Sequence, residues 1–209
     1  MSSTRQSGSF AVVAVVGSQS ALPIARDLLA GLPEDFPAAI VYVQHRAPAG
    51  RSALAAVMRY RARLPVHDVG GGEELRPGAI YVPPAGGQTT VGPDGRLRVE
   101  EGRCLGDALM SSVAAHYGPA AVGVVLSGRL RDGAAGLQAI KWAGGLGLVQ
   151  APETAEADSM PLAAMATGCY DYVLSPARLQ AALVALIAVP GAAQLLGVRA
   201  HPVAAAGQY

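Results

Sequence analysis

The stretch Phe10-Ala-Val-Val-Ala-Val-Val16, followed by Gly17 and Ser18, is an uninterrupted apolar run that ends in a small polar turn. Such a run is typical of a strand that is buried on both faces of a parallel sheet. The next segment, 20–32, carries apolar residues at helical spacing and is stopped by Pro33. A buried strand that leads through a glycine turn into an amphipathic helix predicts the first βα unit of an α/β fold.

Two further apolar runs end in polar turns in the same way. Ala39-Ile-Val-Tyr-Val43 leads to His45, and Ala121-Val-Gly-Val-Val-Leu126 leads to a turn that ends in Asp132. The carboxyl ends of parallel strands meet at one edge of a sheet, where open α/β folds place their sites. We therefore expect Ser18, His45 and Asp132 to lie together as a nucleophile, a base and the carboxylate that orients the base.

The remaining sequence alternates between helix and strand patterns, with one interruption in the middle. There, Pro93-Asp94-Gly95 is a turn signal between short β segments, which predicts an antiparallel hairpin or meander on the border of the sheet. The predicted fold class is α/β: a doubly wound, mostly parallel sheet with helices on both faces and an antiparallel hairpin insertion. Besides the elements above, the pattern predicts helices at 51–61, 107–116, 133–142, 161–166 and 176–187, and β segments at 79–82, 89–91, 97–99, 146–149 and 172–174.

Size and composition set limits on the kind of protein. The chain has 209 residues, of which 51% are hydrophobic and 15% charged, and its formal net charge is +1. We expect one domain with a sizeable core over residues 10–189, between a disordered segment 1–9 and an Ala/Gly/Pro-rich tail 190–209. The near-neutral charge gives no argument for binding nucleic acid or an anionic membrane. The apolar run 10–16 is too short to span a bilayer, so we expect a cytoplasmic protein without membrane insertion.

The residues also give no sign of a metal or a cofactor. Cys104 and Cys169 have no paired spacing, so neither a disulfide framework nor a zinc site is indicated. Gly17 stands alone in the first turn, without the G-x-G-x-x-G pattern of a dinucleotide site. The arginines between Arg46 and Arg76 lack interleaved aromatic residues and are interpreted as a solvated face.

Each candidate residue also has an ordinary structural explanation. Ser18 or Ser20 could be a helix N-cap, and Asp132 could cap the helix that follows it. His45 could be a hydrogen-bonded structural histidine. In favour of catalysis, backbone N–H groups beside a serine at such a turn can stabilise an oxyanion. Imidazole can take a serine proton near neutral pH, while a carboxylate holds the other ring nitrogen. The residues alone leave both explanations open.

Together these motifs resemble the catalytic domain of the chemotaxis-receptor methylesterase, the CheB family, over about residues 10–187. Val16-Gly-Ser-Gln-Ser-Ala21 is loosely similar to the family's G-A-S-T-G-G turn. Leu126-Ser-Gly-Arg-Leu-Arg-Asp-Gly133 is similar to its L-T-G-M-G-x-D-G motif. Further similarity lies in the segments 24–33, 41–45, 70–87, 143–145, 150–155 and 159–161.

The position of the nucleophile depends on the alignment of the first turn. An alignment anchored on Gly17 would place Gln19 at the nucleophile and leave the enzyme inactive. Keeping the next helix free of gaps places Ser18 there instead. We prefer Ser18, because deleting one residue would rotate the apolar face of that helix by about 100°.

Several residues depart from the family's pattern. Gln19 replaces its threonine, and Ser20 and Ala21 replace its two glycines. Near the expected oxyanion region, Arg129 and Leu130 replace methionine and glycine. Ser159 replaces the glycine of the G-M-P motif.

The resemblance implies a serine hydrolase, a protein-glutamate methylesterase and protein-glutamine deamidase of chemotaxis signalling. Ser18, His45 and Asp132 would be its catalytic triad, and the backbone N–H groups of Gln19 and Arg129 would stabilise the oxyanion. The expected partner is a methylated chemoreceptor cytoplasmic domain or a related signalling protein. No receiver domain is expected in this polypeptide. Two alternatives remain: a catalytically degenerate domain that binds a signalling partner, and an enzyme of the same fold that acts on an unrelated ester.

Overall fold

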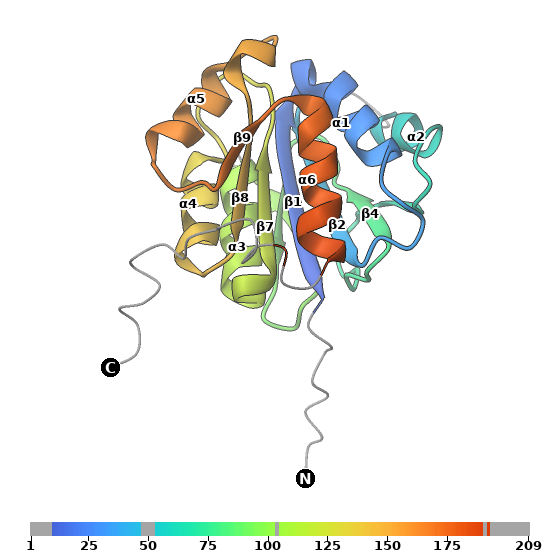
Figure 1. Ribbon diagram of the computed structural model, residues 1–209. Helices are drawn as coiled ribbons and strands as arrows, with labels where there is room; N and C mark the ends of the chain where they lie inside the picture. The colour runs from blue at the N-terminus through green and yellow to red at the C-terminus, as the bar shows by residue number, and fades with distance from the viewer. Residues whose placement is uncertain (1–9, 47–52, 103–104, 190–191, 193–209) are drawn as a thin grey trace, which may run out of the picture.

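A seven-stranded parallel sheet runs through the centre of the molecule (Figure 1). The computed structural model describes residues 10–46, 53–102, 105–189 and 192. Within these residues the strand order is β3-β4-β2-β1-β7-β8-β9, and every neighbouring pair is parallel. The strands are β1 (Ala11–Ser18), β2 (Ala38–His45), β3 (Val66–Asp68), β4 (Ala79–Val82), β7 (Ala121–Val125), β8 (Leu146–Gln150) and β9 (Tyr172–Leu174).

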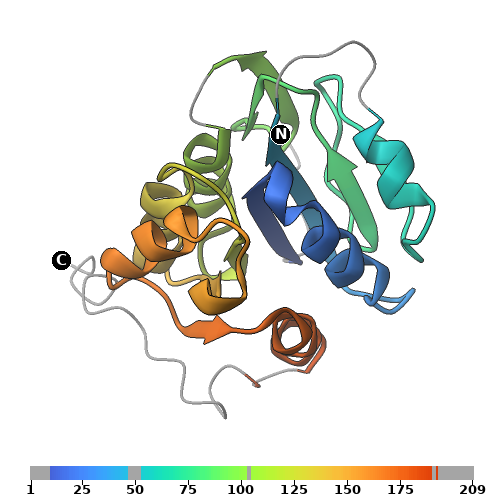
Figure 2. The same cartoon turned by 90° about the horizontal axis from the view of Figure 1, so that it is seen from above.

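Helices cover both faces of this sheet, because successive residues of a buried strand point to opposite sides. In β1, Val13 and Val15 join an apolar cluster with residues of α1, α2 and α6, whereas Val12 and Val16 join a second cluster with α3, α4 and α5. Figure 2 shows these two groups of helices on opposite sides of the strands. The helices are α1 (Leu22–Ala30), α2 (Leu54–Arg59), α3 (Leu105–Tyr117), α4 (Ala134–Trp142), α5 (Ser159–Ala166) and α6 (Pro176–Ala188), with short 3₁₀ turns η1 (Gln19–Ala21), η2 (Gly118–Ala120) and η3 (Pro152–Thr154).

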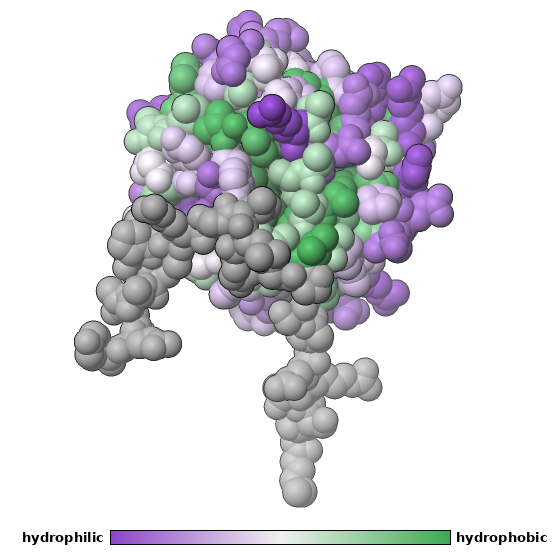
Figure 3. Space-filling model, in the orientation of Figure 1, coloured by the Kyte–Doolittle hydropathy of each residue, from purple (hydrophilic) through white to green (hydrophobic). Residues whose placement is uncertain are grey.

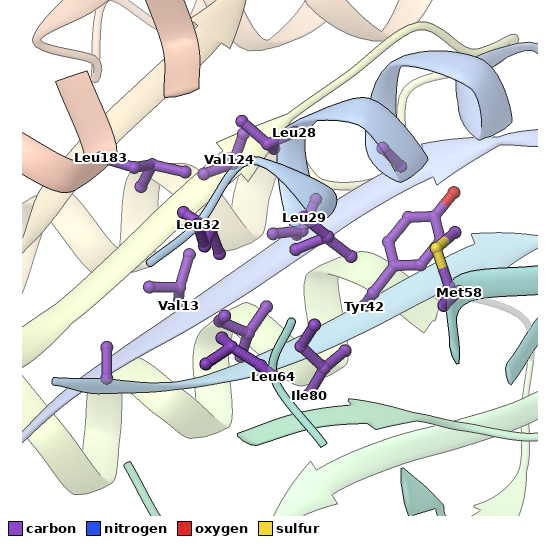
Figure 4. Packing of buried hydrophobic residues seen from close by; sticks show 14 of the residues in the cluster. Val13, Leu28, Leu29, Leu32, Tyr42, Met58, Leu64, Ile80, Val124 and Leu183 are labelled. Carbon is purple, nitrogen blue, oxygen red and sulfur yellow. The ribbon is translucent and has the colours of Figure 1, made fainter. Parts of the chain in front are cut away.

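The first cluster holds β1 and β2 side by side beneath α1 (Figure 4). Tyr42 of β2 is fully buried there near Met58, and its hydroxyl accepts a hydrogen bond from Gln44 Nε2 at 3.1 Å. Burial raises the pKa of Tyr42 well above its ordinary value. Each large apolar side chain buried in this way stabilises the fold by about 1.5–3 kcal/mol, so the relative positions of the two strand ends are strongly determined.

The outer surface over α6 is more mixed. Figure 3, in the same orientation as Figure 1, shows apolar residues toward the middle of this face and polar residues toward its rim. Leu179 and Leu183 of α6 point into the core, while Ala182 and Ile187 are only partly covered. The α6 helix therefore buries one stripe and leaves the adjoining stripe at the surface.

The order of the strands creates a switch point at β1. The chain proceeds from β1 to β2 on one side and later returns to β7 on the other side. Ligand sites in open α/β sheets lie beyond the carboxyl ends of strands at such a point. Here the register pairs Ser18 with His45, and the backbone N–H of Ser18 donates to the Ser127 carbonyl at 3.0 Å. All three predicted polar turns therefore meet at this edge.

The fold class is confirmed, but the middle of the chain differs from the prediction. The antiparallel hairpin consists of β5 (Gly87–Val91) and β6 (Leu97–Glu101), and it forms a separate sheet rather than a border of the main one. It packs on α3, where Val91 N donates to Ser112 Oγ at 2.9 Å. The segment 79–82, expected in that hairpin or meander, instead pairs in parallel with β2. All four residues of β4 are buried, which is typical of an interior parallel strand.

Strand β3 was missed altogether. It has three residues, and only Val66 is buried, so it lacks the length and the alternation that indicate a strand. His67 is an exposed residue of this strand, and its ring packs against that of Tyr81. Of the arginines interpreted as a solvated face, Arg59, Arg61, Arg63 and Arg76 are exposed, whereas Arg46 is half-buried and donates a hydrogen bond to the Pro83 carbonyl at 2.8 Å. Arg51 lies outside the described residues.

The predicted terminal segments 1–9 and 190–209 lie outside the described residues, except for Ala192. Over the part of the chain that the structure describes, no helix is both long enough and apolar enough to cross a lipid bilayer.

Candidate active site

A pocket of about 410 Å³ lies at the switch point, where β1 and β2 end and where the segment after β7 passes close to them. Four of the five predicted site residues line it, and Asp132 lies directly behind His45. A larger pocket of about 570 Å³ lies beside β3, but its described lining contains no serine, threonine or cysteine. The smaller pocket is therefore the better candidate for acyl chemistry. Its lining residues are Ser18, Gln19, Ser20, His45, Arg129, Glu156 and Ala157.

His45 and Asp132 form a short, shielded pair. Nε2 of His45 lies 2.5 Å from Oδ2 of Asp132, and the side chains are 20% and 9% exposed. Because Nε2 faces the carboxylate, Nδ1 is the ring nitrogen left to act as a base. Nδ1 is the nitrogen nearer to the backbone, and the Cα partner of His45 on β1 is Ser18. The pair can thus orient a base toward the end of β1.

Asp132 does more than face the histidine. It accepts hydrogen bonds from the backbone N–H groups of Gly106 at 2.7 Å and Asp107 at 2.9 Å, which begin α3. Asp107 in turn accepts from Gly133 at 2.9 Å and Gly136 at 2.7 Å, which begin α4. Each carboxylate therefore caps the helix that carries or follows the other, whereas the sequence suggested that Asp132 could cap its own following helix.

The pKa values of the Asp107 and Asp132 carboxylates shift in opposite directions. Burial alone would raise the pKa of Asp132, but hydrogen bonds from His45, Gly106 and Asp107 outweigh it and hold the pKa below its ordinary value. At Asp107 burial dominates and the negative charge of Asp132 adds to it, so the pKa of Asp107 is raised. The carboxylate that faces His45 is thus the one that stays ionised, as an orienting group requires.

The Ser18 hydroxyl has a different partner from the one expected. Its Oγ lies 2.8 Å from Ser20 Oγ, and among the described residues it makes no hydrogen bond with His45. Ser18 occupies the N-cap position of η1 but makes no side-chain capping bond, so the N-cap explanation does not account for its hydroxyl. The structure brings Ser18 into the same pocket as His45, with its hydroxyl turned to a neighbouring serine.

Close packing of the end of β1, the turn η1 and the segment after β7 shapes the rest of the pocket. A Cβ on Gly17 would lie 2.5 Å from Ala21 Cβ, and a Cβ on Gly128 would lie 2.1 Å from Met160 Sδ and 3.2 Å from Ser18 N. A side chain at position 128 would crowd both Met160 and the end of β1, so glycine suits the close approach of the segment after β7. The Arg129 backbone N–H then follows directly, and it donates no hydrogen bond to any described residue.

Leu130 adopts a backbone conformation that is rare for a leucine. Its φ is +75°, and its side chain is 74% exposed. The CheB motif L-T-G-M-G-x-D-G, which residues 126–133 resemble, has glycine at this position. A left-handed conformation costs a residue with a Cβ about 1–2 kcal/mol, so the turn beside the pocket is strained.

Sequence reasoning missed Glu156 and Ala157, which line the pocket, and Ser127, which lies behind it. Ser127 is fully buried, and its Oγ lies 2.8 Å from Ser20 Oγ and accepts a hydrogen bond from Ala157 N at 3.0 Å. Ser127 stood within a recognised motif, but no local pattern indicates a partner 107 residues away. Glu156 lies in a polar loop whose sequence gave no signal.

Comparisons with known proteins identify the family of this chain. A sequence profile described as CheB methylesterase matches residues 13–183. A protein-glutamate methylesterase/protein-glutamine glutaminase of Moorella thermoacetica is 36% identical over 190 residues, covering 86% of this chain and 45% of the relative. A relative with the same description, numbered 3, from Anaeromyxobacter dehalogenans is 38% identical over 172 residues, covering 79% of this chain and 50% of the relative.

A solved structure shows that the similarity extends to the fold. The crystal structure of the Thermotoga maritima CheB methylesterase catalytic domain matches with a TM-score of 0.77 and 26% identity, over 86% of this chain and 100% of that one. The chain spans about half the length of the curated relatives it matches. Since the family profile covers most of the sequence, this chain belongs to the CheB methylesterase family.

Proposed function

We propose that the chain is a serine hydrolase that cleaves glutamate methyl esters on a methylated chemoreceptor or a related signalling protein in the cytoplasm. The observation that carries the proposal is the pair formed by His45 Nε2 and Asp132 Oδ2 at 2.5 Å, beside a pocket that also contains Ser18. A histidine held in this way has one ring nitrogen free to act as a base. The names of the relatives supply the substrate class.

In the proposed reaction, Ser18 Oγ attacks the carbonyl carbon of the ester, and its proton passes to His45 Nδ1. The backbone N–H groups of Gln19 and Arg129 stabilise the tetrahedral oxyanion. The C–O bond to the methoxy group then breaks, and His45 returns the proton so that methanol leaves. Water attacks the acyl-enzyme, with His45 again taking a proton, and glutamate and free Ser18 are released. With glutamine as substrate, ammonia leaves in place of methanol.

The test is labelling with a fluorophosphonate probe, which reacts only with an activated serine. We expect labelling of the wild type at Ser18 by peptide mapping, and loss of that label in Ser18→Ala. Labelling at Ser20 would move the nucleophile by two positions. If the folded wild type is not labelled and does not hydrolyse a glutamyl methyl ester peptide, the hydrolase proposal is wrong.

Two observations favour a second candidate, a degenerate domain that binds a signalling partner. The Ser18 hydroxyl pairs with Ser20 and not with His45. Gln19, Ser20 and Ala21 also stand where the resembled turn has threonine and two glycines. This candidate predicts binding of a receptor fragment with no probe labelling. An enzyme retargeted to another ester would instead be labelled and would turn over small esters, but not methylated receptor.

A further inference from the structure

Three serine hydroxyls form a continuous chain that leads from the pocket into the core. Ser18 Oγ lies 2.8 Å from Ser20 Oγ, which lies 2.8 Å from Ser127 Oγ. Ser127 Oγ lies 3.1 Å from the carbonyl oxygen of Ala157 and accepts a hydrogen bond from Ala157 N at 3.0 Å. The chain thus joins the end of β1, the turn η1, the segment after β7 and the loop before α5.

Counting hydrogens gives this chain a direction. Each serine hydroxyl has one hydrogen to donate. The three hydrogens satisfy all three contacts only if Ser18 donates to Ser20, Ser20 donates to Ser127, and Ser127 donates to the Ala157 carbonyl. In that arrangement the single hydrogen of Ser18 is donated to Ser20 and is not available to His45.

The opposite direction is also accessible. If Ser127 donates to Ser20 and Ser20 donates to Ser18, the hydrogen of Ser18 is free to turn toward His45. The Ala157 carbonyl then loses its hydroxyl donor but keeps the hydrogen bond from Gly128 N at 2.8 Å, so no carbonyl is left unpaired. The two directions therefore differ by about one neutral hydrogen bond.

We propose that Ser20 is a positioning residue that holds the Ser18 hydroxyl away from its base in the resting enzyme. The inference rests on the proposed function, in which Ser18 must give its proton to His45. Reaction requires the chain of hydroxyls to reverse or to open, and among the described residues Ser20 is the only hydroxyl that joins the Ser18 hydroxyl to the Ser127 hydroxyl. A residue without a hydroxyl at position 20 would leave Ser18 free to face His45.

The test compares Ser20→Ala with Ser20→Thr, which keeps a hydroxyl. Two quantities are measured on the full chain: the rate of fluorophosphonate labelling at Ser18, and kcat and KM for p-nitrophenyl acetate. We expect Ser20→Ala to label about five-fold faster and to raise kcat by about the same factor with KM unchanged, the effect of releasing one neutral hydrogen bond. Ser20→Thr is expected to restore the slow rate.

The outcomes separate this inference from the proposed function. The exposed Ser111 of α3 provides the control variant Ser111→Ala, which tests for a general effect of losing a serine. Slower or unchanged labelling in Ser20→Ala, with Ser18 still labelled, overturns the positioning role and leaves the hydrolase proposal standing. No labelling of Ser18 in any variant overturns both. A fast Ser20→Thr variant also contradicts the inference, because the hydroxyl would then not be what restrains Ser18.

Discussion

The two sides of the pocket are built from different kinds of interaction. On one side, Asp132 meets His45 and two backbone N–H groups, so a charged acceptor holds the imidazole in one geometry. On the other side, the Ser18 hydroxyl is held by a single neutral hydroxyl, that of Ser20. Hydrogen bonds to charged groups are worth about 1.5–3 kcal/mol, against about 0.5–1.5 kcal/mol for neutral ones. The charged side, which holds the proposed base His45, is therefore rigid. The nucleophile side, named for the proposed role of Ser18, is the one that a small change can adjust.

The largest effect is expected from breaking the charged side. Asp132→Asn leaves one acceptor oxygen where the carboxylate serves three donors, so its NH₂ group must face a donor. If it faces His45, the ring takes the wrong tautomer. We expect kcat on a glutamyl methyl ester to fall by about 10³–10⁴-fold. A fall of less than about ten-fold in a variant with a normal melting curve would contradict the orienting role of Asp132.

A Cβ at Gly17 is expected to disturb the nucleophile side through the backbone. In Gly17→Ala the new Cβ would lie 2.5 Å from Ala21 Cβ, so η1 must move and take Ser18 with it. We expect a loss of about 1–3 kcal/mol in the free energy of unfolding, and of about 10–100-fold in the rate of probe labelling. Gly70→Ala is the matched control, because its Cβ would meet only a Glu73 side-chain oxygen at 3.7 Å. Equal effects in the two variants would disprove the close-packing argument.

Asp107 tests the part of the charged side that is purely structural. Asp107→Ala removes the acceptor for two N–H groups at the start of α4, so the free energy of unfolding should fall by about 2 kcal/mol in urea titrations. Asp158→Ala is the control, since Asp158 is an exposed N-cap with no side-chain capping bond, and it should cost less than about 0.5 kcal/mol. A similar loss of unfolding free energy in both variants would show that the cap from Asp107 to α4 does not stabilise the fold.

The two carboxylates should also respond to pH in opposite directions. The pKa of Asp132 lies below its ordinary value of 3.8 in the folded state, so its contribution to stability is present above 3.8 and is lost as the pH falls through the folded pKa. The pKa of Asp107 is raised, so its contribution is greatest below 3.8 and declines as the pH rises through the folded pKa.

Unfolding measured on both sides of pH 3.8 checks these signs. Asp132→Asn should flatten the loss of stability on the acid side, and Asp107→Asn should flatten the decline on the other side. If both variants change the same side, the assignment of the ionised carboxylate to Asp132 is wrong.

The smallest effect is expected at Leu130, on the strained turn beside the pocket. Leu130→Gly relieves the cost of φ +75°, about 1–2 kcal/mol, while the greater freedom of glycine in the unfolded chain takes back about 0.5–1 kcal/mol. A net stabilisation of about 0.5 kcal/mol should appear as a small rise in Tm. Leu130→Ala keeps the Cβ and should not be stabilised. If alanine stabilises as much as glycine, the gain comes from removing an exposed apolar side chain and not from strain.

The charged side could be predicted from the sequence, and the hydroxyl chain could not. His45 ends the apolar strand β2, and Asp132 lies in the turn after the apolar strand β7. Because the carboxyl ends of parallel strands meet at one edge of a sheet, their proximity follows from topology. The contact between Ser20 and Ser127 joins residues 107 positions apart and depends on the rotamers of small side chains. No periodicity in the sequence carries that information.

The sequence also does not show which helix each aspartate caps. A carboxylate beside a helix start predicts a cap, and both Asp107 and Asp132 do cap helices, but each serves the helix of the other. Local sequence cannot choose between two helix starts that lie side by side in space. Strand β3 was missed for a simpler reason, because three residues with one buried side chain are too few for a pattern.

The exchange of caps makes hydrogen exchange at the start of α3 a measure of the position of the His45 imidazole. Asp132 accepts from His45 and from the amides of Gly106 and Asp107 at once, so the protection of those two amides against hydrogen exchange is thermodynamically linked to the position of the imidazole. In the proposed reaction, a shift of His45 would leave Asp132 with only the two amides of α3 as donors, and exchange at these amides would report that shift. The state of the site would then be measurable on the helix that packs against the β5–β6 hairpin.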